Sequence, residues 1–263
     1  MRSWRFLVSR RWVGFALVVA LLAAGAWWLG EWQFSRLEER QLRNDVIQRN
    51  EAAPPAPVAE VVPADGELDA EDEWRTVTAT GTYAAEETVI VRYRTRDGAS
   101  GVEVVVPLVL DDGTAVLVDR GWLATDNRAA TPDIAPRPPA GEVSITGWAR
   151  RDSSGESTVV SDRSTRAISS EAIGEALDRD VLDGFVALRT EDPAPDEDLA
   201  RTELPELDDG PHFFYGLQWW FFGLLALFGF GYLAWDERRG PRTRRSQRAE
   251  HAPVDREHHA AHE

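Results

Sequence analysis

A histidine at the start of an uncharged apolar segment is the strongest candidate for chemistry in this chain. On a helix, this histidine and four later residues lie near one face, at spacings of 3, 4, 7 and 11 residues: His212, Tyr215, Gly216, Trp219 and Gly223. An imidazole ligates haem iron, apolar walls hold the porphyrin ring, and glycines leave room for its edge. The alternative is an interfacial histidine beside belt aromatics and helix-packing glycines, and the residues alone favour that alternative.

A second candidate is the motif Arg120-Gly121-Trp122, which follows a β-rich run. The functional interpretation is an arginine aimed at a partner or at an anionic group such as a propionate. The structural interpretation is a tight turn at Gly121 with Trp122 in the core, and the residues alone favour it. Arg120, Gly121 and Trp122 remain the candidates for partner contact.

The residue types that are missing exclude most enzyme chemistry. Residues 31–210 contain no His, Cys or Lys, so they lack the side chains of Ser-His-Asp and Cys-His catalysis, Schiff-base chemistry and His/Cys metal sites. The acidic pairs Asp111-Asp112 and Glu86-Glu87 fall in predicted turns or loops, where such pairs are usually solvated. We therefore predict no catalytic residue and no enzymatic activity. A membrane-tethered carboxylate hydrolase acting on envelope sugars is the rival from another class.

Four further histidines lie near the carboxyl end of the chain: His251, His258, His259 and His262. Residues 236–263 are charged and poor in apolar side chains, which predicts a disordered cytoplasmic tail. These histidines could bind a metal weakly, but a solvated tail is favoured.

Two apolar segments flank the central block. Residues 12–30 and 212–235 carry no charged side chain. At about 1.5 Å per residue, helices of these lengths match a hydrocarbon core of about 30 Å, so we predict two transmembrane helices. A cleaved signal peptide is the alternative for the first, because Ala24-Gly25-Ala26 resembles a cleavage site, but the apolar run continues three residues past that site.

The charge distribution predicts how these helices are oriented. Residues 1–11 have a net charge of +4, residues 31–210 of −21 and residues 236–263 of +1. Basic residues mark the cytoplasmic flanks of membrane helices. Both termini are therefore predicted to be cytoplasmic, and the central domain extracytoplasmic, in a two-span protein of the cell membrane. An acidic domain repels phosphate backbones, which argues against nucleic acid as a partner.

Composition divides the block between the spans into four parts. Residues 31–50 place apolar side chains at roughly helical spacing without Gly or Pro and predict a juxtamembrane helix. Residues 51–73 hold four prolines and many acids and predict an extended or disordered linker. Residues 191–211 are acidic and predict a second tether to the membrane. Residues 74–190 remain as one folded domain.

This domain is predicted to be rich in β-strands. Runs of β-branched and apolar residues alternate with turn signals, and the runs are residues 74–83, 88–93, 102–110, 114–119, 143–150 and 185–189. One short helix is predicted from Ser169 or Ser170 to Leu177. We therefore expect an extracytoplasmic, antiparallel small barrel or sandwich with one short helix, and the sequence does not choose between the two.

One hairpin is predicted in more detail. Asp112-Gly113 is a turn signal between two apolar runs, so the chain from Val102 to Trp122 is expected to form two antiparallel strands. Pro107 interrupts the first strand, because proline lacks the amide hydrogen that a strand ladder needs. A bulge or a sheet edge is therefore expected at Pro107.

Several of these motifs together resemble the SURF1 family, the membrane assembly factors of haem–copper terminal oxidases. The resemblance runs from about Arg5 to Trp235, and its motifs are Leu37-Glu38-Glu39-Arg40, Gly81-Thr82-Tyr83, Pro107-Leu108, Asp112-Gly113, Val116 to Trp122, Gly147, and Pro211-His212 with Tyr215, Gln218 and Trp219. The combination of these motifs with two flanking spans is specific. Asp119 stands where the family usually has Asn, and Gly216 where it usually has Ala.

The resemblance implies maturation of a terminal oxidase. Bacterial members are proposed to bind haem a transiently and to help load it into the catalytic subunit. The histidine of their second span is the candidate iron ligand, which corresponds here to His212, beside Tyr215, Gly216 and Trp219. The implied partners are terminal oxidase subunits and the haem a synthesis machinery. A scaffold or chaperone for oxidase subunits that does not touch haem is the alternative.

Overall fold

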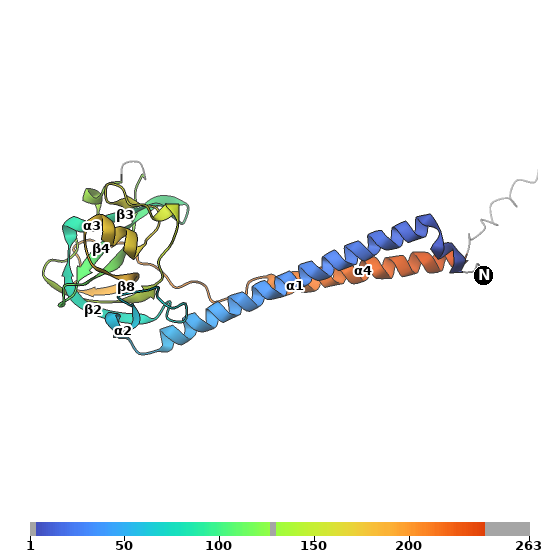
Figure 1. Cartoon of the computed structure of the whole chain (residues 1–263), viewed down its shortest axis with the longest axis horizontal. Helices are drawn as coiled ribbons and strands as arrows, with labels where there is room; N and C mark the ends of the chain where they lie inside the picture. Colours follow the sequence, from blue (N-terminus) through green and yellow to red (C-terminus); the bar gives the residue numbers. More distant parts are fainter. Residues whose placement is uncertain (1–3, 127–129, 240–263) are drawn as a thin grey trace, which may run out of the picture. The chain divides into compact units, whose positions relative to one another are not determined.

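The chain folds into two compact units, one formed by residues 1–38 with 209–263 and the other by residues 39–208. The computed structural model describes residues 4–126 and 130–239 (Figure 1). The predicted disordered tail lies outside the described residues from position 240 onward, together with its four histidines. Positions 1–3 of the predicted basic amino terminus also lie outside them.

The first unit contains one long helix, α4, and the larger part of another, α1, whose last residues belong to the second unit. A 3-10 helix, Trp4–Val8, precedes α1 (Arg10–Ala52), and α4 comprises His212–Arg239. Both α1 and α4 are long and apolar enough to cross a membrane, and only 17% and 11% of their most apolar stretches are buried. A core helix of a soluble protein would bury most of that surface, so the outward-facing apolar side chains fit a membrane protein.

The helix α1 unites two predicted elements, the span at 12–30 and the helix at 31–50. No Gly or Pro interrupts the chain from residue 31 to the end of α1, so nothing breaks its hydrogen-bond ladder. Pro54 and Pro55 follow directly, and the residue before a proline avoids helical backbone angles, which explains why the helix ends at Ala52.

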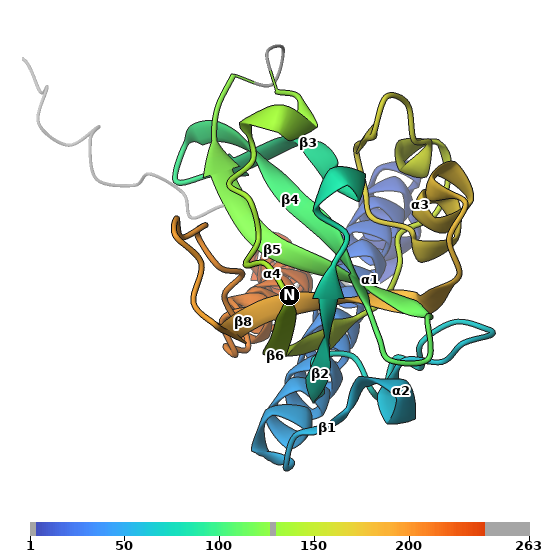
Figure 2. The same cartoon turned by 90° about the vertical axis from the view of Figure 1, so that its left-hand side faces the viewer.

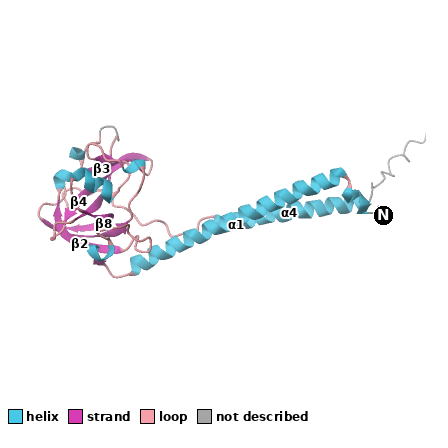
Figure 3. Ribbon diagram, in the orientation of Figure 1, coloured by secondary structure: helices cyan, strands magenta, loops and turns pink. Residues whose placement is uncertain are grey.

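Within the first unit, α1 and α4 lie side by side and run antiparallel (Figure 3). Glycines and aromatic rings of the two helices contact each other across this interface. The indole of Trp220 on α4 lies against Gly30 of α1 and stacks on Trp27, with 5.0 Å between ring centroids. The ring of Phe34 on α1 in turn lies against Gly216 of α4. Each glycine therefore makes room for an aromatic side chain of the other helix, a use of small residues that is common between membrane helices.

The second unit is a mainly-β domain with few helices (Figure 2). Its strands are β1 (Ala56–Pro57), β2 (Thr76–Tyr83), β3 (Val89–Arg96), β4 (Ala99–Val109), β5 (Ala115–Ala124), β6 (Glu142–Arg150), β7 (Ser164–Thr165) and β8 (Val181–Asp192). Its helices are α2 (Val58–Val61), α3 (Ser170–Leu177) and the 3-10 turns Ala85–Glu87, Pro132–Ile134 and Glu156–Thr158.

The strands of the second unit form one sheet in which five strands close on themselves. The order is β1-β2-β6-β8-β5-β4-β3-β7, and β2 also pairs with β4, so β2, β6, β8, β5 and β4 form a closed circuit. The prediction of an antiparallel sheet is only partly correct, because β5 and β8 are parallel, as are the short pairs β1–β2 and β3–β7. The chain between β5 and β8 contains β6, β7 and α3, which is long enough for the crossover that parallel strands need.

The predicted hairpin is confirmed; its bulge is not at Pro107, but Pro107 has a strand partner on one side alone, which fits the sheet edge that was the other expectation there. Strands β4 and β5 pair antiparallel, with Val102 opposite Leu123 and Pro107 in register opposite Leu117. The register shifts instead where Val104 faces Gly121 and the next residue, Val105, faces Asp119. Arg120 is therefore the extra residue of a β-bulge.

The predicted short helix is confirmed as α3. The hydroxyl of Ser169 accepts a hydrogen bond from the amide of Ala172 at 3.3 Å and caps its first turn. Ile173 of this helix is fully buried and packs with Val89, Val105 and Leu117 on the outer face of the sheet, forming a second, smaller core.

Two predicted connecting segments are parts of the folded domain. The stretch at 51–73 is not a free linker, because Val58, Val62 and Leu68 are buried in the main core and α2 lies within it. The tether at 191–211 begins inside β8, and its Leu199 is buried in the same core. Proline and acid content predicted disorder, but apolar residues at a few positions are enough to attach both segments.

Candidate functional site

His212 is the first residue of α4 and is partly exposed. Its ring Nδ1 lies 2.8 Å from Oε1 of Gln33 on α1. Among residues 4–126 and 130–239, no second hydrogen-bond partner of this imidazole is found, so Nε2 is available to a ligand. This arrangement matches the usual state of a metal-binding histidine, in which the other ring nitrogen is held by a hydrogen bond.

The other four predicted members of this site do not all lie beside His212 on an open face of the helix. Tyr215 is exposed and Trp219 is partly exposed. Gly216 is buried against Phe34, and a Cβ there would lie 2.8 Å from that ring. At Gly223 a Cβ would lie 3.2 Å from the Cβ of Ala26. The two glycines thus accommodate α1, as the helix-packing alternative predicted, and do not open space for the edge of a macrocycle.

The donor set nevertheless fits a haem iron. A single neutral imidazole with one free nitrogen is a sufficient axial ligand, and the side chains around the start of α4 are mostly aromatic and exposed: Phe213, Phe214 and Tyr215. His212 would hold the iron, and these aromatic side chains would contact the ring. Gly216 and Gly223 have no direct part in such a site.

The second candidate motif lies in the β domain, at the bulge of β5. Gly121 has a φ of 129° and a Cβ there would lie 2.7 Å from the carbonyl oxygen of Ala200, so only glycine fits without strain. The extra residue changes the alternation of side chains along β5. Arg120 faces the main core, as Val118 two residues before it does, and the bulge places Trp122 on the other face of the sheet together with Asp119.

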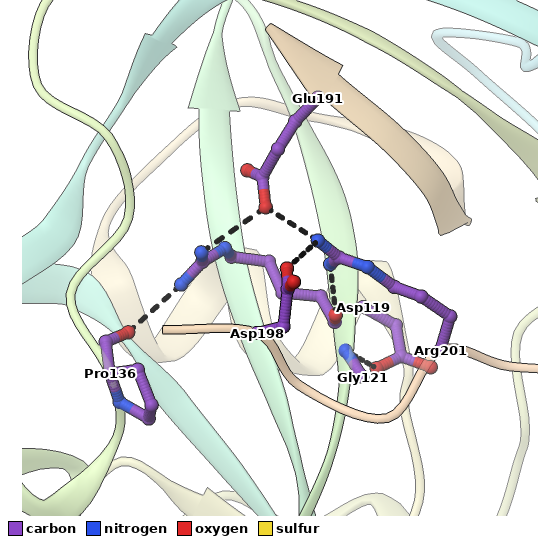
Figure 4. Close-up of polar contacts among 7 residues, drawn as sticks. Asp119, Gly121, Pro136, Glu191, Asp198 and Arg201 are labelled. Atoms are coloured by element: carbon purple, nitrogen blue, oxygen red, sulfur yellow. Dashed lines mark hydrogen bonds and ion pairs between the residues drawn. The ribbon is translucent and has the colours of Figure 1, made fainter. Parts of the chain in front are cut away.

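Arg120 is fully buried and forms an ionic cluster inside the domain (Figure 4). Its guanidinium donates to Oε1 of Glu191 at 3.3 Å and to the carbonyl oxygen of Pro136 at 2.9 Å, and it lies 5.5 Å from the centre of the Tyr83 ring. Burial raises the pKa of the Tyr83 phenol, and the nearby Glu191 carboxylate raises it further. The arginine predicted to contact a partner is therefore a core residue of the domain.

Arg201 attaches the segment after β8 to this cluster. It donates to the same Oε1 of Glu191 at 2.8 Å and to the carbonyl oxygen of Arg120 (Figure 4). Two backbone hydrogen bonds join Ala200 to Trp122, at 2.8 and 3.0 Å. The buried Glu191 carboxylate thus accepts hydrogen bonds from two arginines, Arg120 of the hairpin and Arg201 of the segment between β8 and α4.

Asp119 lies on the opposite face of the same motif and is 4% exposed. Its carboxylate accepts hydrogen bonds from the Gly121 amide at 3.1 Å and the Thr202 hydroxyl at 3.3 Å. Burial, together with the Glu103 carboxylate on β4, raises the pKa of Asp119 to about 7. Asp119 and Glu103 line a cavity of about 300 Å³ together with Arg94, whose Nε lies 2.9 Å from Glu103 Oε2.

Trp122 is only partly buried, which differs from the predicted core position. Its indole lies against Gly101 of β4 and donates to the carbonyl oxygen of Arg94 at 3.2 Å. It lines a second cavity of about 510 Å³ beside Tyr93 and Arg96. Trp122 is therefore the member of the predicted contact motif whose side chain reaches the surface.

The acidic pairs noticed in the sequence have structural roles. Glu87 receives two hydrogen bonds from Arg179, both at 2.6 Å, and Asp112 accepts from the Thr114 amide at 2.9 Å in the hairpin turn. The structure does bring together two carboxylates that were not noticed in the sequence, Glu103 and Asp119 on neighbouring strands. Only the pairing register of the hairpin could have indicated them.

Two apolar helices joined to one mainly-β domain fit the class of membrane proteins with a single anchored β domain. The family model of the SURF1 family matches residues 20–224. The chain is 31% identical over 256 residues to uncharacterized SURF1-like proteins of Mycobacterium bovis and Mycobacterium tuberculosis, covering 95% of this chain and 92% of theirs. The chain belongs to the SURF1 family, which confirms the resemblance seen in its motifs.

Proposed function

We propose that this protein is an assembly factor of cytochrome oxidase, anchored in the cell membrane by α1 and α4. Membership of the SURF1 family, which implies a role in cytochrome oxidase assembly, is the observation that carries this proposal. SURF1 is a family of assembly factors not known as enzymes, and one member of each acidic pair, Asp112 and Glu87, makes a structural contact. The β domain would supply the surface that binds oxidase subunits.

The proposed topology places both termini in the cytoplasm and the β domain outside. It is supported by the basic residues before the first span and after the second, and by the strongly acidic domain between them. The chain has no cysteine, so single cysteines at Ser3, Thr131 and Ser246 can be labelled with an impermeant thiol reagent in whole cells. Labelling at Thr131 alone is expected, and labelling at Ser3 or Ser246 alone would reverse the orientation.

The more specific proposal is that haem a binds at His212 on its way to the oxidase. It is supported by the free Nε2 of the imidazole and by the aromatic side chains beside it. An axial histidine supplies the bond to iron, while an apolar helix surface holds the porphyrin ring and leaves its propionates at the water boundary. The haem synthesis machinery would then be a second partner, upstream of the oxidase subunits.

His212→Ala is expected to abolish the bound-haem absorbance of protein purified from cells that also make haem a. Protein level and the circular dichroism of the β domain should stay unchanged, and oxidase activity in the same cells should fall. The matched control is deletion of residues 249–263, which removes the other four histidines and should leave the spectrum unaltered. Equal haem binding by His212→Ala and wild type would refute the site.

The alternative function is a haem-independent scaffold for oxidase subunits. One observation favours it: Gly216 and Gly223 pack against α1, so the first unit is already a well-packed helix pair without a macrocycle. Wild-type protein that purifies without haem from haem a-producing cells, while its loss still lowers oxidase content, would establish this alternative.

A further inference from the structure

The amide oxygen of Gln33 lies 2.8 Å from Nδ1 of His212, although the two residues are 179 positions apart. We propose that Gln33 is the positioning residue of this histidine: it fixes the proton on Nδ1 and presents Nε2 to haem iron. The inference rests on the proposed haem-binding function, but the tautomer that it specifies is a property of the protein alone.

The direction of the hydrogen bond follows from the chemistry of its two atoms. An amide oxygen only accepts hydrogen bonds, so Nδ1 must carry a proton, and in the neutral imidazole Nε2 then holds a lone pair. A neutral imidazole in water prefers the other tautomer, with its proton on Nε2, which cannot ligate a metal through that atom. A partner at Nδ1 is therefore needed to select the competent tautomer, and such partners also raise the basicity of the ligand.

Neighbouring contacts hold the two residues in this relation. Phe34, the residue after Gln33, packs into the space left by Gly216, one helical turn after His212. One turn before Phe34, Gly30 accommodates the ring of Trp220. Gly216 and Gly30 thus set the register of α1 against α4, and this register brings Gln33 to the imidazole.

The first experiment needs no haem. The full chain is labelled with ¹⁵N-histidine in detergent, at a pH where imidazole is neutral, and the His212 signals are assigned by difference from His212→Ala. Wild type should show protonated Nδ1 and unprotonated Nε2. Gln33→Leu removes the acceptor and should move His212 to the Nε2-protonated tautomer, whereas Gln33→Glu keeps an acceptor and should retain the wild-type tautomer.

The matched control is Gln218→Leu, which removes an exposed glutamine from α4 and should leave the His212 signals unchanged. A wild-type His212 that carries its proton on Nε2, or a tautomer that does not respond to Gln33→Leu, would overturn the inference whatever the protein does with haem.

The second experiment titrates the purified proteins with haem a extracted from a cytochrome oxidase. Gln33→Leu should weaken binding by about 10–100-fold, the usual cost of losing the outer partner of a ligating histidine. Gln33→Glu should restore the affinity and lower the reduction potential of the bound haem, because a carboxylate makes the imidazole more electron-donating. Equal affinity of wild type and Gln33→Leu would refute the positioning role. Failure of wild type to bind haem, with the Nδ1 tautomer intact, would instead refute the proposed haem binding and leave the positioning of the imidazole by Gln33 standing.

Discussion

Glu191→Ala is expected to lower the free energy of unfolding of the β domain by about 3–5 kcal/mol, because it leaves two arginines of a buried cluster without their carboxylate. Glu191 accepts from Arg120 at 3.3 Å and from Arg201 at 2.8 Å, and the side chains of Glu191 and Arg120 are both 0% exposed. Urea unfolding of the compact unit, residues 39–208, measures this change. A shorter segment would cut off Arg201 and the core residues Val58 and Val62.

Two further variants test whether the effect comes from the burial of the charges and not from the loss of an ordinary surface ion pair. Arg137 lies 3.3 Å from Glu86, and both side chains are more than 80% exposed, so Arg137→Ala should cost less than about 1 kcal/mol. The double variant Arg120→Met/Glu191→Leu removes both buried charges and should recover a large part of the stability lost in Glu191→Ala. A loss below about 1 kcal/mol in Glu191→Ala would mean that water reaches the cluster.

Local patterns in the sequence predicted the elements that depend on local interactions. The spans, the absence of helix breakers after the first one, the Asp112-Gly113 turn and the serine cap of α3 each rest on residues a few positions apart. Interactions between residues this close in the sequence can be predicted from residue types and spacing. Helices long and apolar enough to span a membrane, the turn and the capped helix appear where they were predicted, and α1 extends well beyond its apolar segment.

Contacts between residues far apart in the sequence could not be predicted from such local patterns. Arg120 and Glu191 are 71 positions apart, and an arginine followed by Gly and Trp is equally compatible with a surface motif. Arg120 faces inward by regular alternation after Val118, but the bulge at Arg120 depends on the register against β4, and this extra residue reverses the face on which Trp122 lies. The sequence left a partner contact of Arg120 open and favoured a core position for Trp122, whereas the structure buries Arg120 fully and Trp122 only partly.

In the candidate haem site, too, one residue could be predicted from local sequence and its long-range partner could not. His212 was identified from residue type and helical spacing alone, but Gln33 could not be, because only the antiparallel packing of α1 on α4 brings it near. Gly216 and Gly223 on that helix face could have left space either for a macrocycle or for a neighbouring helix, because the sequence does not show which group fills the space beside a glycine. Phe34 and Ala26 fill it in the structure.

Asp119→Asn is expected to stabilise the β domain at pH 8 by on the order of 2–4 kcal/mol, with almost no effect at pH 4. The pKa of this buried carboxyl is about 7 in the folded protein, against 3.8 for an ordinary aspartate. Between these values the folded state holds a proton that the unfolded chain has released. The stabilising contribution of Asp119 is therefore complete below about pH 4 and is lost as the pH rises through 7.

Asparagine keeps the oxygen that accepts from the Gly121 amide and removes the charge that burial and Glu103 disfavour. Urea unfolding of the 39–208 unit across pH 4–8 should thus give curves that coincide in acid and diverge above neutrality. Asp112→Asn is the matched control, because its exposed carboxylate also accepts a backbone amide, from Thr114, and should show no such divergence. A constant difference between wild type and Asp119→Asn at every pH would mean that Asp119 is ionised throughout, held by Arg94 beside Glu103, and that the charge on this face of the motif costs the fold nothing.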